Sequence, residues 1–465
     1  MTVTDPIAEA IGLIGYASDA PGIGGLLKVR TSDFRVEEVA TSLALDPKGR
    51  FTVARITLTN WETNRFCQQL ANRLRIPRNR IFFAGTKDKR AITSQIFVID
   101  APQSKVANIE MSDVEIEILG RTHQKIGFGN HRGNRFTIVV RGCADEHGHP
   151  LSNEDALTRI SNIVEEMTIS VGAEKFPNWI GPQRFGSGRP VTAATGQFAL
   201  RSDWENAVMT YLTMPGEEDE DAAVVRRKIL QEGISEELIE EMPKWMGYER
   251  RMIEHLLKNE NDYIGAFSTL PSNLQLMTIH SVQSKIFNTS MKNRLSSGIS
   301  LSEPQIGDLV GRIDEKGQLE VSSCVEVKAK NQPRISRNCS MGRLVTTGPL
   351  PGCELSYAHG DIGSLEELAA DELGLSSLDW VISDIPALTT NGTRRALVTM
   401  FEEFQFETVP IAENAIEESN KAEKTKDNQT WHEQGACVRF RFTLPPGSYA
   451  TILLREFMKS PTNHL

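Results

Sequence analysis

The sequence has few cysteines and no pair of them spaced for a metal or redox motif. Its 465 residues include six cysteines, and none forms a C-x-x-C pair, which argues against a zinc ribbon. Six are also too few for a disulfide framework in a chain of this length, which favours a reducing compartment. No run approaches the roughly 18 apolar residues that a membrane-spanning helix needs, and residues 1–25 lack the pattern of a signal peptide. We therefore expect a cytoplasmic protein without a membrane segment.

Motifs that bind common cofactors or activate a serine are also missing. The sequence contains no G-x-x-x-x-G-K-[ST] phosphate loop, no G-x-G-x-x-G fingerprint and no G-x-S-x-G nucleophile elbow. His147 and His149, beside Asp145 and Glu146, lie in a polar loop without a second ligand pair at helical spacing. We therefore expect neither a metal site nor a cofactor.

The charge that is present is unevenly distributed. The whole chain carries a net charge of −10, which taken alone argues against a nucleic-acid-binding protein. Residues 24–141, however, hold 20 Lys and Arg against 11 Asp and Glu, a net charge of +9, so the remainder carries −19. An acidic body with a basic segment suits a protein that contacts a polyanion on one surface. The alternative is a solvated, arginine-rich helical face.

The length of 465 residues predicts two or three domains. In the N-terminal third, apolar alternation and β-branched residues predict strands at 26–39, with a turn at 31–33, and at 51–58, 81–84, 94–100 and 135–140. Phe66, Leu70 and Leu74 recur at a spacing of four residues and predict a helix. We expect Thr63 to cap this helix and Pro77 to end it.

The middle of the chain is acidic and its end returns to a strand pattern. We predict helices at 153–168, 222–260 and 275–294, short strands within 300–360, a solvated acidic loop at 216–221 and a mobile polar segment at 413–430. Alternation over 438–444 predicts a half-buried strand, and Ser448 is expected to cap a final helix at 449–459. We infer one sheet-based domain made of the basic segment and this C-terminal strand and helix, with the acidic middle inserted into it.

The densest cluster of candidate catalytic side chains surrounds Asp88. This carboxylate stands among Lys87, Lys89, Arg90 and the nearby Arg80, directly after a short apolar strand and a glycine. Cations within about 4–6 Å lower the pKa of a carboxylate and keep it ionised. An ionised aspartate on a loop held by a sheet is a candidate nucleophile or base. The alternative is a turn whose aspartate only forms salt bridges.

A glycine-rich turn at 127–133 leads into a second candidate site at Asn134 and Phe136. An asparagine can hydrogen-bond to the edge of a base, and a phenylalanine can stack on one. A phenylalanine at the start of a strand is more often part of the protein core.

Six short stretches match one known set of motifs in the same order. They are Lys28 with 33–38 (DFRVEE), 60–63 (NWET), 84–95 (AGTKDKRAITSQ), 133–136 (GNRF), 177–186 (PNWIGPQRFG) and 444–456 (LPPGSYATILLRE). Glu62 stands where the set has Asp, and Ile180 where it has an aromatic residue. On these residues the chain resembles the TruD family of tRNA pseudouridine synthases, with the length of an archaeal member. Residues 190–275 and 300–430 match only loosely.

The resemblance implies an α+β fold in two parts. One is a pseudouridine-synthase catalytic domain with a mixed, largely antiparallel sheet, expected at residues 1–174 and 399–465. The other is an inserted α+β TRUD domain, expected at 175–398. Together they are expected to form a V-shaped molecule with a cleft for RNA.

The resemblance also implies an activity. A specific uridine in tRNA, expected at position 13, is isomerised to pseudouridine, so the N1–C1′ bond breaks and a C5–C1′ bond forms. The uridine must leave the base stack first. Asp88 is the implied catalytic carboxylate, which either attacks C1′ or initiates deprotonation at C2′, and Lys28 is its positive partner. The reaction needs no cofactor, in line with the missing motifs.

The resemblance further implies which residues hold the substrate. The expected substrate-binding residues are Phe136, Asn134, Lys87, Arg90, Gln183 and Arg184. Phe136 is expected to stack on the uracil, Asn134 to hold Asp88 or the base, and cations within 65–90 to contact phosphates. tRNA is the expected partner, and no obligate protein partner is evident. Two rival functions are a non-catalytic RNA-binding or RNA-folding protein and an unrelated hydrolase that uses Asp88.

Overall fold

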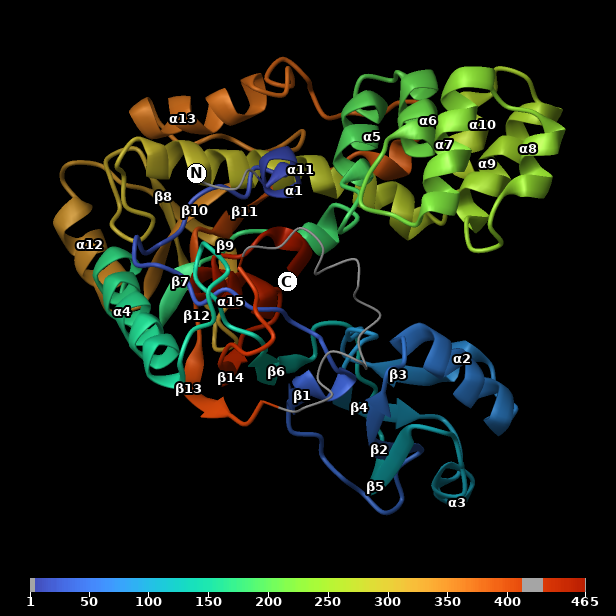
Figure 1. Cartoon of the computed structure of the whole chain (residues 1–465), viewed down its shortest axis with the longest axis horizontal. Coiled ribbons are helices and arrows are strands. Elements are labelled where there is room, and N and C mark those ends of the chain that lie inside the picture. Colours follow the sequence, from blue (N-terminus) through green and yellow to red (C-terminus); the bar gives the residue numbers. More distant parts are fainter. Residues whose placement is uncertain (1–4, 412–429, 465) are drawn as a thin grey trace.

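A computed structural model describes residues 5–411 and 430–464 of the chain. In these residues the protein has an eight-stranded sheet, a four-stranded sheet and a two-stranded ribbon, together with many helices. Figure 1 shows the large sheet in the lower half of the molecule and a group of helices at the upper right. The predicted α+β fold is confirmed. No helix of the described residues is both long and apolar enough to cross a membrane.

The eight-stranded sheet combines strands from both ends of the chain. Its order is β13-β14-β6-β1-β4-β2-β5, with β3 paired to β4. The strands are β1 (Phe34–Ala40), β2 (Phe51–Thr59), β3 (Ile81–Phe83), β4 (Ile92–Ile99), β5 (Val114–Thr122), β6 (His131–Val140), β13 (Glu402–Val409) and β14 (Cys437–Leu444). β1 runs parallel to β4, and the other pairs named here are antiparallel. The expected mixed, largely antiparallel sheet is therefore confirmed.

The chain leaves this sheet after β6 and returns to it at β13. β14 then lies between β6 and β13, so the C-terminal strand completes the sheet that the basic segment begins. β7 (Lys175–Pro177) and β12 (Val398–Met400) pair as an antiparallel ribbon. This ribbon lies where the insertion is predicted to begin and to end.

The strand predicted from residue 26 starts only at Phe34. Leu26 forms an isolated bridge with Arg141, but Lys28 adopts a left-handed backbone with φ of 56°. Left-handed geometry interrupts a strand, and residues 31–33 then form a short 3-10 turn. The first part of the predicted 26–39 strand is therefore wrong.

Both predicted helix caps are also wrong, because each hydroxyl has another partner. Helix α2 (Thr63–Leu74) is capped by the Glu62 carboxylate, while the Thr63 hydroxyl accepts the N–H of Lys87 at 3.0 Å. Helix α15 (Ala450–Met458) begins after Tyr449, and the Ser448 hydroxyl instead lies 3.0 Å from that of Thr399.

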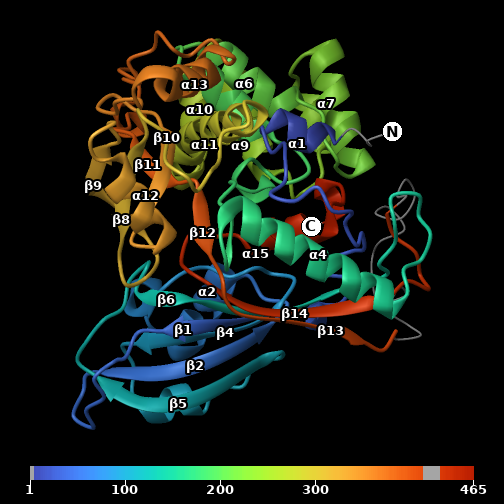
Figure 2. The same ribbon diagram turned by 90° about the vertical axis from the view of Figure 1, so that its left-hand side faces the viewer.

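Two helices cover the part of the sheet that both chain ends build. Helix α4 (Asn153–Val171) and helix α15 share one apolar core with β1, β6 and β14. Figure 2 shows α4 and α15 between this sheet and the rest of the molecule. On β2 and β4, a separate core packs against the apolar face of α2. Two separate apolar cores therefore support the sheet. One packs on β1 and the strands toward β14, and the other packs on β4 and β2, so the central strand β1 lies where the two meet.

The second part of the molecule has its own sheet and helices. The four-stranded sheet has the order β11-β10-β8-β9, formed by β8 (Leu309–Ile313), β9 (Leu319–Glu326), β10 (Leu344–Leu350) and β11 (Thr393–Ala396). The helices here are α5 (Val191–Ala199), α6 (Trp204–Thr213), α7 (Glu220–Glu232), α8 (Glu236–Glu241), α9 (Gly247–Lys258), α10 (Tyr263–Ser268), α11 (Ser272–Ser296), α12 (Gln332–Ser340) and α13 (Gly360–Asp371). Short helices α1 (Pro6–Ala10) and α3 (Gln103–Ala107) complete the set described here.

Buried ion pairs support this second part. Arg294 binds Asp308 at 2.6 Å, and the two side chains are 5 % and 0 % exposed. Arg394 pairs with Glu366 in the same region.

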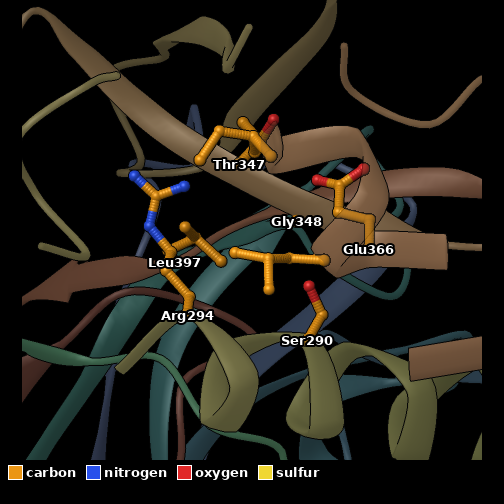
Figure 3. A pocket seen from close by; sticks show the side chains of 8 residues that line it. Ser290, Arg294, Thr347, Gly348, Glu366 and Leu397 are labelled. Carbon is orange, nitrogen blue, oxygen red and sulfur yellow. The ribbon is translucent and has the colours of Figure 1, made fainter. Parts of the chain in front are cut away.

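Between α11, α13 and β10, a cavity of about 10 Å³ is lined by residues that include Ser290, Glu366 and Leu397 (Figure 3). That volume holds about one water molecule, so this cavity is no site for a larger ligand.

The acidic run at 216–221 contacts a buried arginine and leads into a helix. The run at 216–221 is not simply a solvated loop, because Glu218 accepts a hydrogen bond from the buried Arg226 at 2.9 Å and α7 starts at Glu220. Residues 413–430, predicted to be mobile, lie outside the described residues except for residue 430.

Candidate active site

The candidate site lies over the centre of the large sheet. β1 is flanked by β4 on one side and β6 on the other, and Val36 pairs with both Thr93 and Phe136. On the far side of β6, Phe136 pairs with Phe442 of β14. The loop from β3 to β4, residues 84–91, carries the predicted catalytic aspartate to this place.

Asp88 and Lys28 form a direct ion pair. The Lys28 Nζ atom lies 2.9 Å from Asp88 Oδ2, with side chains 17 % and 37 % exposed. The same ammonium lies 4.6 Å from the ring centre of Phe34. The left-handed backbone of Lys28 is a rare conformation for a lysine. The predicted partners, 60 residues apart, are thus brought together with part of the carboxylate open to a ligand.

Asp88 opens into a cavity of about 150 Å³. The cavity is lined by Phe34, Val36, Thr86, Lys87, Asp88, Asn134, Phe136, Gln183, Ser448, Tyr449, Ala450 and Thr451. The lining therefore combines three parts of the chain: the basic segment, the 177–186 motif, and the turn after β14 together with the start of α15. The 444–456 motif was recognised in the sequence, but none of residues 448–451 was predicted to belong to the site.

Phe136 belongs both to the core and to the cavity wall. Its side chain packs edge-on against Phe34 at 6.3 Å and stacks on Phe442 at 5.4 Å. It is 8 % exposed and lines the cavity. The two readings of this residue, core and ligand contact, are therefore compatible.

Asn134 presents an unpaired acceptor beside the cavity. Its Oδ1 atom is buried and has no hydrogen-bond partner among the described residues, and the residue lines the cavity. A buried amide oxygen without a partner costs free energy, so it is available to a donor on a ligand. The preceding Gly133 is required, because an added Cβ would lie 2.3 Å from the carbonyl oxygen of Leu444.

Lys87 lines the cavity, but its ammonium points to a carboxylate. The Lys87 Nζ atom lies 3.1 Å from Glu38 Oε2, with side chains 6 % and 1 % exposed. The backbone N–H of Lys87 is held by Thr63, and Glu38 also accepts the N–H of Ile96 at 3.3 Å. Lys87 is therefore fixed at both ends, directly before Asp88. This geometry favours a positioning role over the predicted contact with substrate.

Three polar residues near the Asp88 loop were not predicted as site residues from the sequence: Glu38, Gln95 and His131. A signal for Glu38 was present, since it follows Phe34 and Val36 at strand spacing and so faces the same buried side. Gln95 is 1 % exposed, and both of its amide atoms lack a partner within the part of the chain that the structure describes. Burial, followed by the charges of Lys87 and Lys316, lowers the pKa of His131 to about 4. His131 is therefore neutral near pH 7.

The remaining predicted substrate contacts divide into two groups. Gln183 lines the 150 Å³ cavity and also a neighbouring cleft of about 720 Å³, which includes Lys28. Arg90 and Arg184 lie outside the lining of both spaces. Arg90 donates to the carbonyl of Val29, next to Lys28, at 3.0 Å.

The described residues contain no group of three or more His, Cys, Asp or Glu placed to hold a metal ion. The loop that contains His147 and His149 forms hydrogen bonds within itself instead. His149 Nδ1 lies 3.0 Å from Asp145 Oδ2, and Asp145 accepts the N–H groups of His147 and His149. These contacts account for the loop as a turn.

Comparisons with known proteins agree on one family. The family described as "tRNA pseudouridine synthase D (TruD)" matches residues 10–457. A probable tRNA pseudouridine synthase D of Halobacterium salinarum is 35 % identical, with 99 % of both chains covered. Another, of Methanosarcina acetivorans, is 34 % identical, with 97 % of both chains covered.

A solved structure extends the likeness to the fold. The crystal structure of the putative tRNA pseudouridine synthase D (TruD) of Methanosarcina mazei covers 100 % of both chains at 31 % identity, with a TM-score of 0.81. The fold implied by the motifs is therefore confirmed over the whole length. The chain belongs to the TruD family of tRNA pseudouridine synthases.

Proposed function

We propose that the protein isomerises one uridine of tRNA, at position 13, to pseudouridine, with Asp88 as the catalytic carboxylate. Membership of the family supports the reaction class. The observation that carries the residue assignment is the Lys28–Asp88 pair at 2.9 Å at the wall of a small cavity. A buried ion pair in the core needs no opening beside it, whereas a nucleophile does.

The cavity suits one flipped nucleotide. Its volume of about 150 Å³ lies below the roughly 300–1,000 Å³ of pockets for larger ligands. A nucleobase offers two faces to apolar side chains and polar edges to hydrogen-bonding groups. Phe136 supplies an aromatic wall, and the unpaired Asn134 Oδ1 supplies an acceptor for the imide N–H of uracil.

Asp88 starts the reaction as an anion held by Lys28. In one route its carboxylate attacks C1′ and the N1–C1′ bond breaks. In the other it takes a proton from C2′ and the base leaves as an anion. In both routes the uracil turns and C5 bonds to C1′. This bond displaces the Asp88 carboxylate from C1′ in the first route, and Asp88 returns its proton to C2′ in the second. The proton on C5 is then released to solvent, and N1 takes up a proton. The residues that would stay in contact with the free base are Phe136 and Asn134.

The domain division is part of the same proposal. We assign residues 1–174 and 399–465 to the catalytic domain and 175–398 to the inserted TRUD domain. The β7–β12 ribbon supports these boundaries, because it holds together the two connections between the parts. tRNA lies between the parts, with phosphates on the basic segment.

The test uses the purified protein and a tRNA transcript labelled with tritium at C5 of uridine. The proposal predicts tritium release, with the mass of the digested nucleosides unchanged. A protein that only binds or folds RNA gives binding without tritium release. A hydrolase gives free uracil, which mass spectrometry detects. Mapping of the product tests position 13 separately.

A further inference from the structure

An exposed phenylalanine lies on a loop attached to the catalytic loop. Phe128 is 73 % exposed, between Gly127 and Gly129 in the turn before β6. The N–H of Gly129 donates to the carbonyl of Ala84 at 2.8 Å. Ala84 precedes Asp88 by four residues, so the two lie at most about 14 Å apart along the chain. The mechanism proposed above makes no use of this ring.

The loop around Phe128 is held in place on several sides. Asn130 donates its N–H to Gly127 at 3.0 Å, and its carbonyl accepts a hydrogen bond from the Thr41 hydroxyl at 3.0 Å. Lys316, from the turn between β8 and β9, donates to the carbonyl of Gly129 at 3.2 Å. The exposure of Phe128 is thus a property of an anchored turn.

The ring is only partly supported by the protein. Phe128 meets Phe83 with ring centres 5.3 Å apart and planes at 62°, so most of its surface stays free. A Cβ placed on Gly127 or Gly129 would meet nothing within 4 Å. The turn is therefore open to solvent beside both neighbouring glycines.

Two cations lie near this aromatic pair. Arg78 lies 5.2 Å from the ring centre of Phe83. Lys316 reaches the loop itself. Aromatic side chains framed by cations are the usual means of binding unpaired nucleotides, because the ring stacks on a base while the cations attract phosphates.

We propose that Phe128 stacks on a base of the RNA substrate, at a nucleotide outside the cavity that receives the uridine. The proposal rests on the proposed function, which supplies the RNA. It adds a second binding position for an unpaired nucleotide, close enough to the catalytic loop for one RNA segment to reach both. A duplex end or a bulged nucleotide offers such a base.

The test compares Phe128→Ala, Phe128→Trp and Ile169→Ala with the wild type in binding to an unmodified tRNA transcript. Ile169 is 81 % exposed on α4 and serves as the control for loss of an exposed apolar side chain. Phe128→Ala is expected to weaken binding at least about fivefold. The slope of binding against salt concentration stays as in the wild type, because the ring neutralises no phosphate. Phe128→Trp and Ile169→Ala bind like the wild type.

A direct signal comes from the fluorescence of Phe128→Trp. A base stacked on the new indole quenches its emission, so tRNA quenches this variant more than the wild type, which has six tryptophans of its own. Unchanged binding by Phe128→Ala, or equal quenching of the two proteins, overturns the proposal. If the wild type binds tRNA but releases no tritium, the proposed function fails, while the binding result still decides the role of Phe128.

Discussion

At the scale of single residues, the buried pair of Glu38 and Lys87 fixes the loop that carries Asp88. Glu38 holds the ammonium and Thr63 holds the backbone N–H. A buried charge that loses its partner is left uncompensated, which costs on the order of 3–5 kcal/mol. Removal of Glu38 alone also frees an ammonium one residue from the proposed catalytic carboxylate, Asp88.

We therefore expect Glu38→Gln to lower kcat more than it raises KM and to lower the free energy of unfolding by about 3 kcal/mol. The double variant Glu38→Gln with Lys87→Met removes both charges, so it should lose less stability than the sum of the single variants. Urea unfolding and single-turnover rates measure both effects. Additive losses would show that the two side chains act independently.

His131 makes stability depend on pH. Its pKa is about 4 in the folded protein, mainly because it is buried, against about 6.5 in an unfolded chain. Between these values the unfolded state binds more protons, so stability falls as the pH drops from about 6.5 to 4 and changes no further from this residue below that.

The variant His131→Gln removes this titration. We expect the wild type to lose stability on the order of 2–3 kcal/mol more than the variant between pH 7 and pH 4. Urea unfolding at several pH values gives the two curves. Parallel curves would show that His131 is not the group responsible.

At the scale of elements, the close approach of β6 and β14 shapes the cavity. An added Cβ on Gly133 would lie 2.3 Å from the carbonyl oxygen of Leu444. The turn that follows Leu444 and the start of α15 together provide four residues of the lining, 448–451. A shift of β14 therefore moves one wall of the site.

Gly133→Ala should lower the free energy of unfolding by about 1–3 kcal/mol and reduce activity together with it. Gly247→Ala, at the start of α9, is the matched control, because an added Cβ there meets nothing within 4 Å. Thermal unfolding and the tritium assay measure both. Equal behaviour of the two variants would contradict the argument from close packing.

Most elements could be predicted from the sequence, and the two wrong helix caps have a common cause. The strands that follow alternation and the helix marked by Phe66, Leu70 and Leu74 are present. The caps assigned to Thr63 and Ser448 failed because their hydroxyls bind groups far away in the chain. Local patterns carry no record of such contacts.

At the scale of the whole molecule, the site is built from distant parts of the chain. The motifs predicted five site residues that the fold brings together: Lys28, Asp88, Asn134, Phe136 and Gln183. The sequence charge pattern does not distinguish the buried Lys87 from lysines and arginines on the surface. Its ion-pair partner, Glu38, lies on β1 and comes close only when the strands pair. The same limit applies to Arg90 and Arg184, which lie outside the cavity lining.

The N-terminal segment is also joined to the C-terminal helix by hydrogen bonds. Arg455 of α15 donates to the carbonyls of Leu13 and Gly15, and the buried Glu456 accepts the N–H of Ala17. These contacts fasten the N-terminal segment, which leads to Lys28, onto the C-terminal helix. Arg455 and Glu456 of the family motif thus support the fold from outside the cavity lining.

The central claim is that Asp88 reacts with a flipped uridine. The most direct test compares Asp88→Asn with the wild type in tRNA binding and in tritium release. Asp100→Asn is the control, because it makes the same chemical change at an aspartate that pairs with Arg50 outside the cavity lining. The account predicts that Asp88→Asn folds and binds tRNA normally but releases tritium at least about a thousandfold more slowly. Turnover near the wild-type rate by Asp88→Asn would contradict it.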